Sequence, residues 1–259
     1  MNRALVPLSA TVPRFVPTQP RNRREDSITV MTATTNDPIR RTLAATLLVF
    51  PCLFVLVFLM HFRHGSEFLH FRLHYVPLPP DRVVTALIRA QNRWPMIHDP
   101  HVLGYLSLPF LPLCAFALYL VGKRARPVAS AIALTITVTG TIYLGGVFGM
   151  WTAFYRGLGL VDAAHTEGAI ATFKALTTNQ GAFLLTTTLA KLAMIGLAAQ
   201  ALTLTGKIAS WAVVCVVLGA VVFLRFWDLD NWMTIGTLLI LAGFIPVRRA
   251  LLADEAVQR

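Results

Sequence analysis

Hydrophobic residues occur along the chain in long runs that are separated by shorter polar segments. An α-helix needs about 20 mainly apolar residues to cross a ~30 Å hydrocarbon core. Six runs meet or approach this length, and they predict membrane-spanning helices over residues 43–60, 102–121, 128–151, 182–204, 209–226 and 232–247. The pattern therefore predicts an all-α integral membrane protein, a six-transmembrane-helix bundle that occupies residues 42–250.

The third run has small side chains at every fourth position: Ala129, Ala133, Thr137, Thr141, Gly145 and Gly149. Small residues let helices approach closely in lipid, where packing and interhelical hydrogen bonds drive association. Because residues four apart lie on one side of a helix, we expect these six to form a packing ridge. A helix with such a ridge is expected to be the central helix of the bundle.

The first 41 residues show no sustained hydrophobic period and are rich in proline and arginine, which predicts a disordered basic tail. Residues 251–259 are expected to form a second, short tail. Met31 is a second candidate start, and no cleavage-site pattern follows the first apolar run, so we do not expect a removed signal peptide.

The orientation is predicted from the basic residues, which accumulate on the cytoplasmic side of membrane proteins. Outside the first tail they divide evenly between the two sides, but the tail itself is basic and Lys123, Arg124 and Arg126 crowd one short loop. We therefore expect both termini to be cytoplasmic and the protein to lie in the plasma membrane.

The long connection after the first run, residues 61–101, contains two periodic segments. Residues 69–75 alternate between apolar and polar, which predicts an extended segment with one apolar face. A segment that begins at Pro80 has apolar residues at helical spacing and arginines between them, so we expect an interfacial helix that lies flat on the membrane. In the later connection, a further helix is expected after Asp162.

Composition supports the prediction of a membrane protein and argues against a soluble domain or a nucleic-acid-binding protein. Charged residues make up 14% of the chain and apolar residues 56%, whereas soluble domains are about 25% charged. The net charge is +11, but the basic residues lie beside the apolar runs and do not form a basic domain interleaved with aromatic residues. Nucleic acid is therefore not an expected partner. Membrane lipid is expected, with a membrane-protein partner or a second copy of this chain as further candidates.

The histidines cluster: six of the seven lie in or beside residues 61–101. Imidazole is a common metal ligand and titrates near neutral pH. His61 and His64 follow the first run, while His98 and His101 flank the start of the second, so these four are candidate metal or haem ligands. Hydrogen-bonded interfacial histidines and a pH sensor are the alternatives.

Lys191 is the one charged residue near the middle of an apolar run, a position that often marks a functional site. All twelve Asp and Glu residues lie outside the runs, so no carboxylate partner is expected at its depth. Its expected partners are the hydroxyls of Thr187, Thr188 or Tyr143, backbone carbonyls, or an anionic ligand. These four residues are candidate ligand-binding residues.

The last polar turn has Arg225, Asp228 and Asp230 beside two tryptophans, which predicts an ion pair and an aromatic belt at the outer interface. No Walker loop, dinucleotide fingerprint or zinc-protease motif occurs in the sequence, so no catalytic residue is predicted.

The leading hypothesis is therefore a non-enzymatic membrane protein that binds or passes a small ligand and needs no cofactor. The alternatives are a membrane redox protein that binds haem or copper through the histidines, and an accessory or scaffolding subunit of a membrane complex.

Overall fold

The computed structural model describes residues 38–62, 64–74, 76, 78–91, 100–178 and 182–257. Their helices are α1 (Pro38–Leu59), α2 (Gly65–Phe68), α3 (Pro80–Gln91), α4 (Pro100–Ser107), α5 (Phe110–Gly122), α6 (Pro127–Gly159), α7 (Thr166–Thr178), α8 (Ala182–Ala190), α9 (Leu192–Thr203), α10 (Ser210–Arg225) and α11 (Asp230–Val257). No strand occurs among these residues. The predicted first tail lies largely outside them, and the last residues of the second tail do too.

Five helices are long and apolar enough to cross a membrane: Pro38–Leu59, Pro100–Gly122, Pro127–Gly159, Leu184–Thr203 and Asp230–Ala253. The second is α4 and α5 together, interrupted near Pro109. The remaining apolar helix, α10, has 16 residues and is shorter than the others. The prediction of an all-α membrane protein is confirmed in this form, with five candidate spans.

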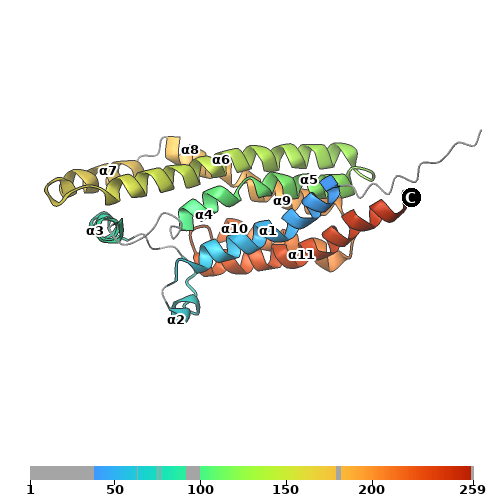
Figure 1. Ribbon diagram of the computed structural model, residues 1–259, viewed down its shortest axis with the longest axis horizontal. Helices are drawn as coiled ribbons and strands as arrows, with labels where there is room; N and C mark the ends of the chain where they lie inside the picture. Colours follow the sequence, from blue (N-terminus) through green and yellow to red (C-terminus); the bar gives the residue numbers. More distant parts are fainter. Residues whose placement is uncertain are drawn as a thin grey trace, which may run out of the picture. The chain divides into compact units, whose positions relative to one another are not determined.

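The long helices pack side by side (Figure 1). α11 packs against α10 and α1, and α9 packs against α10 and α6. α5 contacts α1, α6, α9 and α11, and its residues Leu111, Cys114 and Leu118 are fully buried. α5 therefore occupies the position that we expected for the third run.

α6 is a side helix of the bundle and not its centre. Its 33 residues make it ~50 Å long at 1.5 Å per residue, and it continues to Gly159, beyond the predicted end at Trp151. It contacts α3, α4, α5, α8 and α9, but Ile132 and Ile142 remain 56% and 69% exposed, and its span is the least buried of the five candidates, at 33%. The prediction of a central third helix is therefore wrong.

The predicted ridge is only partly a packing surface. Ala133, Thr137 and Thr141 are buried, Gly145 and Gly149 are half-buried, and Ala129 is exposed. The buried positions instead follow alternating steps of four and three residues: Ala133, Thr137, Gly140, Leu144 and Val147. A helix has 3.6 residues per turn, so a row of fixed four-residue steps rotates away from its neighbour, whereas alternating steps stay on it.

The closest approach of α6 and α9 is at glycines outside the predicted ridge. A Cβ atom added to Gly140 would lie 2.6 Å from Ala193 Cα, and one added to Gly196 would lie 2.5 Å from Thr137 Oγ1. At Gly145 the nearest atom, Leu108 Cδ1, would be 3.8 Å away, which is an ordinary contact. Thr137 is thus the member of the ridge that meets a glycine of α9.

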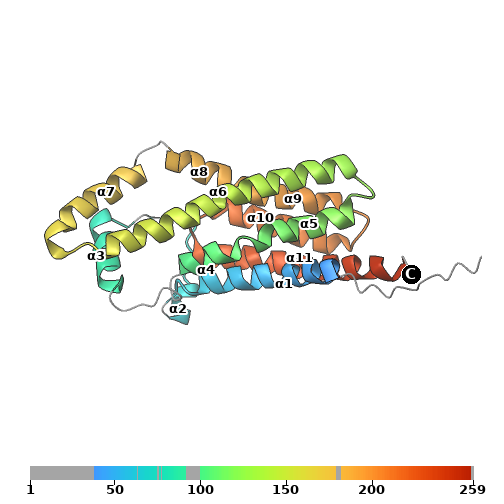
Figure 2. The same ribbon diagram turned by 45° about the horizontal axis from the view of Figure 1, so that its top comes forward.

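A second hydrophobic core joins α3, α7 and the last turns of α6, which together we call the cap (Figure 2). Its buried residues are Val84, Leu158, Ala169 and Phe173. α7 confirms the helix expected after Asp162, whose carboxylate accepts a hydrogen bond from the backbone nitrogen of His165 at 3.2 Å. α3 exists as predicted and packs on α6 and α7, where Val84 of its apolar stripe is buried; contact of the helix with the membrane stays a prediction.

The predicted extended segment adopts no regular secondary structure between residues 69 and 74. Leu69 and Leu73 are exposed, so the alternation does not create an apolar face. Phe71 is also exposed, although its ring contacts the rings of Phe68 and Trp232. The segment lies against the beginning of α11. Its backbone is hydrogen-bonded there by side chains of α11 and not by a neighbouring strand.

Candidate functional site

A groove of about 570 Å³ lies where α11 begins. Small-molecule sites usually have volumes of about 300–1,000 Å³. The groove is formed by the residues that follow α1, by α2, by the irregular segment after α2, and by the turn between α10 and α11. Its lining residues are Phe62, Glu67, His70, Arg72, Val76, Leu78, Asp228, Leu229, Asp230 and Asn231.

Two side chains at the start of α11 hold one wall of this groove in place. Asn231 Nδ2 donates a hydrogen bond to the His70 carbonyl at 3.2 Å, and Trp232 Nε1 donates to the Arg72 carbonyl at 2.8 Å. The Trp232 ring also stacks on Phe226, with ring centroids 4.4 Å apart. Because these bonds satisfy backbone carbonyls that no strand could pair, the irregular segment keeps a defined position.

Asp228 occupies the turn opposite this wall with a left-handed backbone, φ 69°. Aspartate and asparagine tolerate this conformation better than most residues. Within the described part of the chain, no hydrogen bond or ion pair engages its carboxylate. The residue is exposed, but the partial removal of water by the surrounding protein, and then the charge of Asp230, raise its pKa to about 6, although Lys191 and His101 act in the opposite direction.

Asp230 differs because it has a close partner. His61 Nδ1 lies 3.4 Å from its Oδ1 atom and 3.1 Å from the Val57 carbonyl. Both neighbours are acceptors, so this nitrogen carries the proton. The side chains of His61 and Asp230 are each 28% exposed.

The structure brings together two of the four candidate histidines. The rings of His61 and His101 are 5.4 Å apart and perpendicular, and His101 has the same relation to Tyr155 at 5.3 Å. His64 lies elsewhere, as the exposed residue before α2, and His98 is outside the described residues. The polar groups therefore continue from the groove through His61 to the side of α6.

Among the described residues, no group of three or more His, Cys, Asp or Glu side chains is arranged to hold a metal ion. Haem needs only one or two protein ligands, so binding of haem, or of copper with the help of His98, stays a prediction.

Lys191 lies at the break between α8 and α9, where its backbone nitrogen donates to the Thr188 carbonyl at 3.3 Å. The Thr187 hydroxyl donates to the Leu184 carbonyl, and Tyr143 is 37% exposed. Among the described residues no carboxylate forms an ion pair with Lys191, although its charge lowers the pKa of Asp228. The 16 residues of α10 span only ~24 Å, less than the ~30 Å thickness of a hydrocarbon core.

The predicted ion pair of Arg225 is not formed. The described residues contain no such pair with Asp228 or Asp230, and the guanidinium carbon instead lies 5.2 Å from the centre of the Phe226 ring. The aromatic part of the prediction agrees with the stacking of Phe226 and Trp232.

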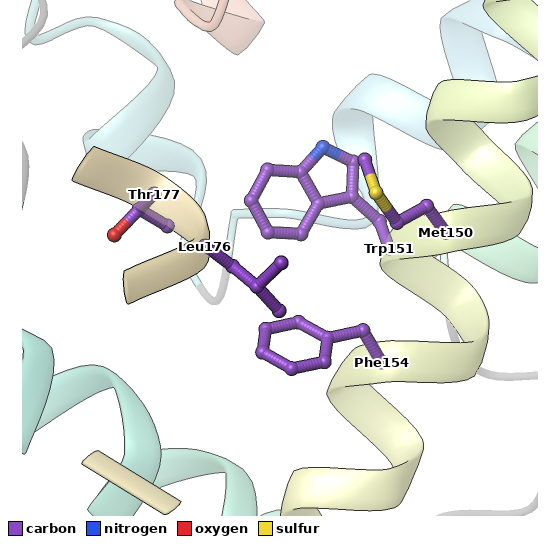
Figure 3. A pocket seen from close by; sticks show the side chains of 5 residues that line it. All are labelled: Met150, Trp151, Phe154, Leu176 and Thr177. Atoms are coloured by element: carbon purple, nitrogen blue, oxygen red, sulfur yellow. The ribbon is translucent and has the colours of Figure 1, made fainter. Parts of the chain in front are cut away.

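A second, much smaller hollow of about 10 Å³ lies between α6 and α7 (Figure 3). Met150, Trp151 and Phe154 approach it from α6, and Leu176 points toward them from α7. The Thr177 hydroxyl points away and donates to the Phe173 carbonyl. The space has the size of about one water molecule but offers no polar partner, so it is a packing gap and not a ligand site.

Sequence reasoning missed Glu67, His70 and Arg72 as groove residues. Their wall is fixed by bonds between residues about 160 positions apart, such as Asn231 with His70, and no local pattern reports such contacts. Asp228 and Asp230 were noticed, but only as members of an interfacial ion pair.

Fold and site together define an all-helical membrane protein with a polar groove at one end of its bundle. Comparisons of the chain with protein-family models, curated proteins and solved structures find no match.

Proposed function

We propose that this chain is a non-enzymatic, multi-pass protein of the plasma membrane that binds a small ligand in the groove beside Asp228 and passes it toward Lys191. The observation that carries the proposal is the groove itself, with a volume of about 570 Å³ and a wall held by Asn231 and Trp232. A site of this size with a fixed wall and several polar groups is what a small ligand requires.

The topology in this proposal has six spans: the five long helices and the shorter α10, which is the fifth span in chain order. α1 ends and α11 begins at the groove, so the start of α1 and the end of α11 lie together at the other end of the bundle (Figure 1). Basic residues occur at that other end, including Arg41, Lys123 and Arg249. This supports cytoplasmic termini and a groove that faces outward.

The proposed passage of the ligand from the groove toward Lys191 is based on the electrostatic effect of Lys191 on Asp228. Lys191 lies at a helix break in the interior of the chain's apolar part, yet it is close enough to Asp228 to lower the pKa of that carboxyl. A ligand at Asp228 therefore lies within the electrostatic influence of Lys191, which is the next charged group inward.

A binding test compares the wild-type protein with Leu78→Trp, which fills the groove. The purified protein is mixed with a defined set of small amines, sugars and carboxylates, passed rapidly through a desalting column, and analysed by mass spectrometry. We expect the wild type to retain at least one compound that Leu78→Trp loses.

Leu160→Trp is the matched control, because Leu160 is 76% exposed and does not line the groove. Retention of no compound, or equal retention by both tryptophan variants, would contradict a ligand site in this groove.

A further inference from the structure

The lining of the groove differs in charge from the rest of the chain. The whole sequence has 23 Lys and Arg residues and 12 Asp and Glu residues, close to two cations for each anion. The groove reverses this ratio in its lining, where Glu67, Asp228 and Asp230 stand beside one guanidinium, that of Arg72, and the ring of His70. Glu67 accepts a hydrogen bond from the backbone nitrogen of His64, and Asp230 is paired with His61. An occupant of the groove therefore meets an excess of negative charge.

The remaining walls are mostly apolar: Phe62, Val76, Leu78 and Leu229. A small inorganic ion would not use such walls, because it needs oxygen ligands on several sides. An organic molecule with an apolar body would cover them and gain free energy from the removal of their surface from water.

Asp228 and Asp230 are not equivalent. Asp230 already has the His61 ring 3.4 Å away, whereas the Asp228 carboxylate has no ion pair or hydrogen bond to any described residue. Building on the proposed function, we infer that the ligand of this groove is a small organic cation, a protonated amine or quaternary ammonium with an apolar body, whose positive group binds against Asp228.

The charged groups around Asp228 fix the expected effect of pH. They are Asp230 and His61 at the ends of α11 and α1, His101 on α4, Lys191 between α8 and α9, and Glu67, His70 and Arg72 in the opposite wall. As the pH falls through about 6, Asp228 takes up a proton and loses its charge. The loss of this negative charge weakens the binding of a cation but not of a neutral molecule.

The effect of charge on binding is separated from that of size with three probes of nearly equal shape: benzylammonium, benzyl alcohol and benzoate. Their binding to the full-length protein is measured by ligand-observed NMR in phosphatidylglycerol nanodiscs at pH 7.5 and pH 5. Asp228→Asn is the test variant, because asparagine keeps the shape and tolerates the left-handed backbone. Glu167→Gln removes an exposed carboxylate that does not line the groove.

We expect benzylammonium to bind about tenfold or more tightly than benzyl alcohol at pH 7.5, as for a charge-assisted contact. Benzoate is expected to be the weakest. The preference for the cation should fall by about tenfold at pH 5 and be lost in Asp228→Asn, while Glu167→Gln retains it.

Equal binding of all three probes, or a preference that survives Asp228→Asn, overturns the cation inference and leaves a ligand groove of another class. Binding of none of them overturns the groove as a ligand site, and the proposed function with it. Repeating the measurement in phosphatidylcholine nanodiscs identifies the source of the cation. Weaker binding there means that a lipid ammonium group competes, and unchanged binding means that the site takes a soluble amine.

Discussion

Gly140→Ala tests the contact on which the packing of α6 against α9 depends. The new Cβ atom would meet the backbone of Leu192 and Ala193, lying 2.6 Å from Ala193 Cα. Nonbonded carbon atoms are most favourable at about 3.5–4.0 Å. Because the obstacle is main chain and not the end of a flexible side chain, α6 and α9 must separate by about 1 Å.

Overpacking of this kind destabilises a protein by about 1–3 kcal/mol. For a chain of this size, 1 kcal/mol corresponds to a shift in Tm of about 2–4 °C. A middle value of about 2 kcal/mol gives a decrease of about 4–8 °C for Gly140→Ala.

The matched control is Gly145→Ala, at which the nearest atom is Leu108 Cδ1 at 3.8 Å. Alanine also favours helix over glycine, so we expect its Tm to be unchanged or higher. The assay is thermal unfolding in one detergent, followed by intrinsic tryptophan fluorescence. Equal decreases in Tm for the two variants would refute the assignment of the tight contact to Gly140. They would instead favour the predicted packing ridge that includes Gly145.

Three further predictions concern other parts of the molecule. Ser130 is fully buried and its hydroxyl has no partner among the described residues, so Ser130→Ala should leave the Tm unchanged or raise it; a clear decrease would show that the hydroxyl is bonded. Phe173→Ala should destabilise the cap by about 3–5 kcal/mol, measured as faster limited proteolysis near α7, and unchanged cleavage would contradict the second core. The folded protein holds the Asp228 proton more tightly than the unfolded chain, so stability falls as the pH rises from about 4 to about 6 and stays lower above that. Asp228→Asn should therefore raise the Tm at pH 8 and lose this advantage toward pH 4, and a gain independent of pH would refute the raised pKa.

Long apolar runs were sufficient to predict the helices, because a bilayer permits few structures other than helices that satisfy their own backbone. They could not predict how the helices pack. The small residues of α6 predicted a ridge, but the deciding contact involves Gly140, because the neighbour on α9 selects which face is used.

The groove was the least predictable part of the molecule. Asp228 and Lys191 are 37 positions apart, yet the charge of Lys191 lowers the pKa of Asp228, and no local sequence pattern reports such a relation. The apolar stripe of α3 was recognised correctly, but a stripe alone does not distinguish a lipid surface from a protein surface. Val84 is fully buried against protein because α6 continues past the predicted end of its span.

That continuation has a mechanical consequence. About 20 of the 33 residues of α6 are enough to cross the hydrocarbon core, so about 13 residues, or ~20 Å of helix, extend beyond it. The cap is built directly on this extension, which continues as one helix from the segment that contacts α9 and carries Gly145, Gly146 and Gly149 on the way. A movement of the cap is therefore coupled to the contact at Gly140 through a single helix, and the glycines between them are where α6 would bend if the cap tilts without opening that contact.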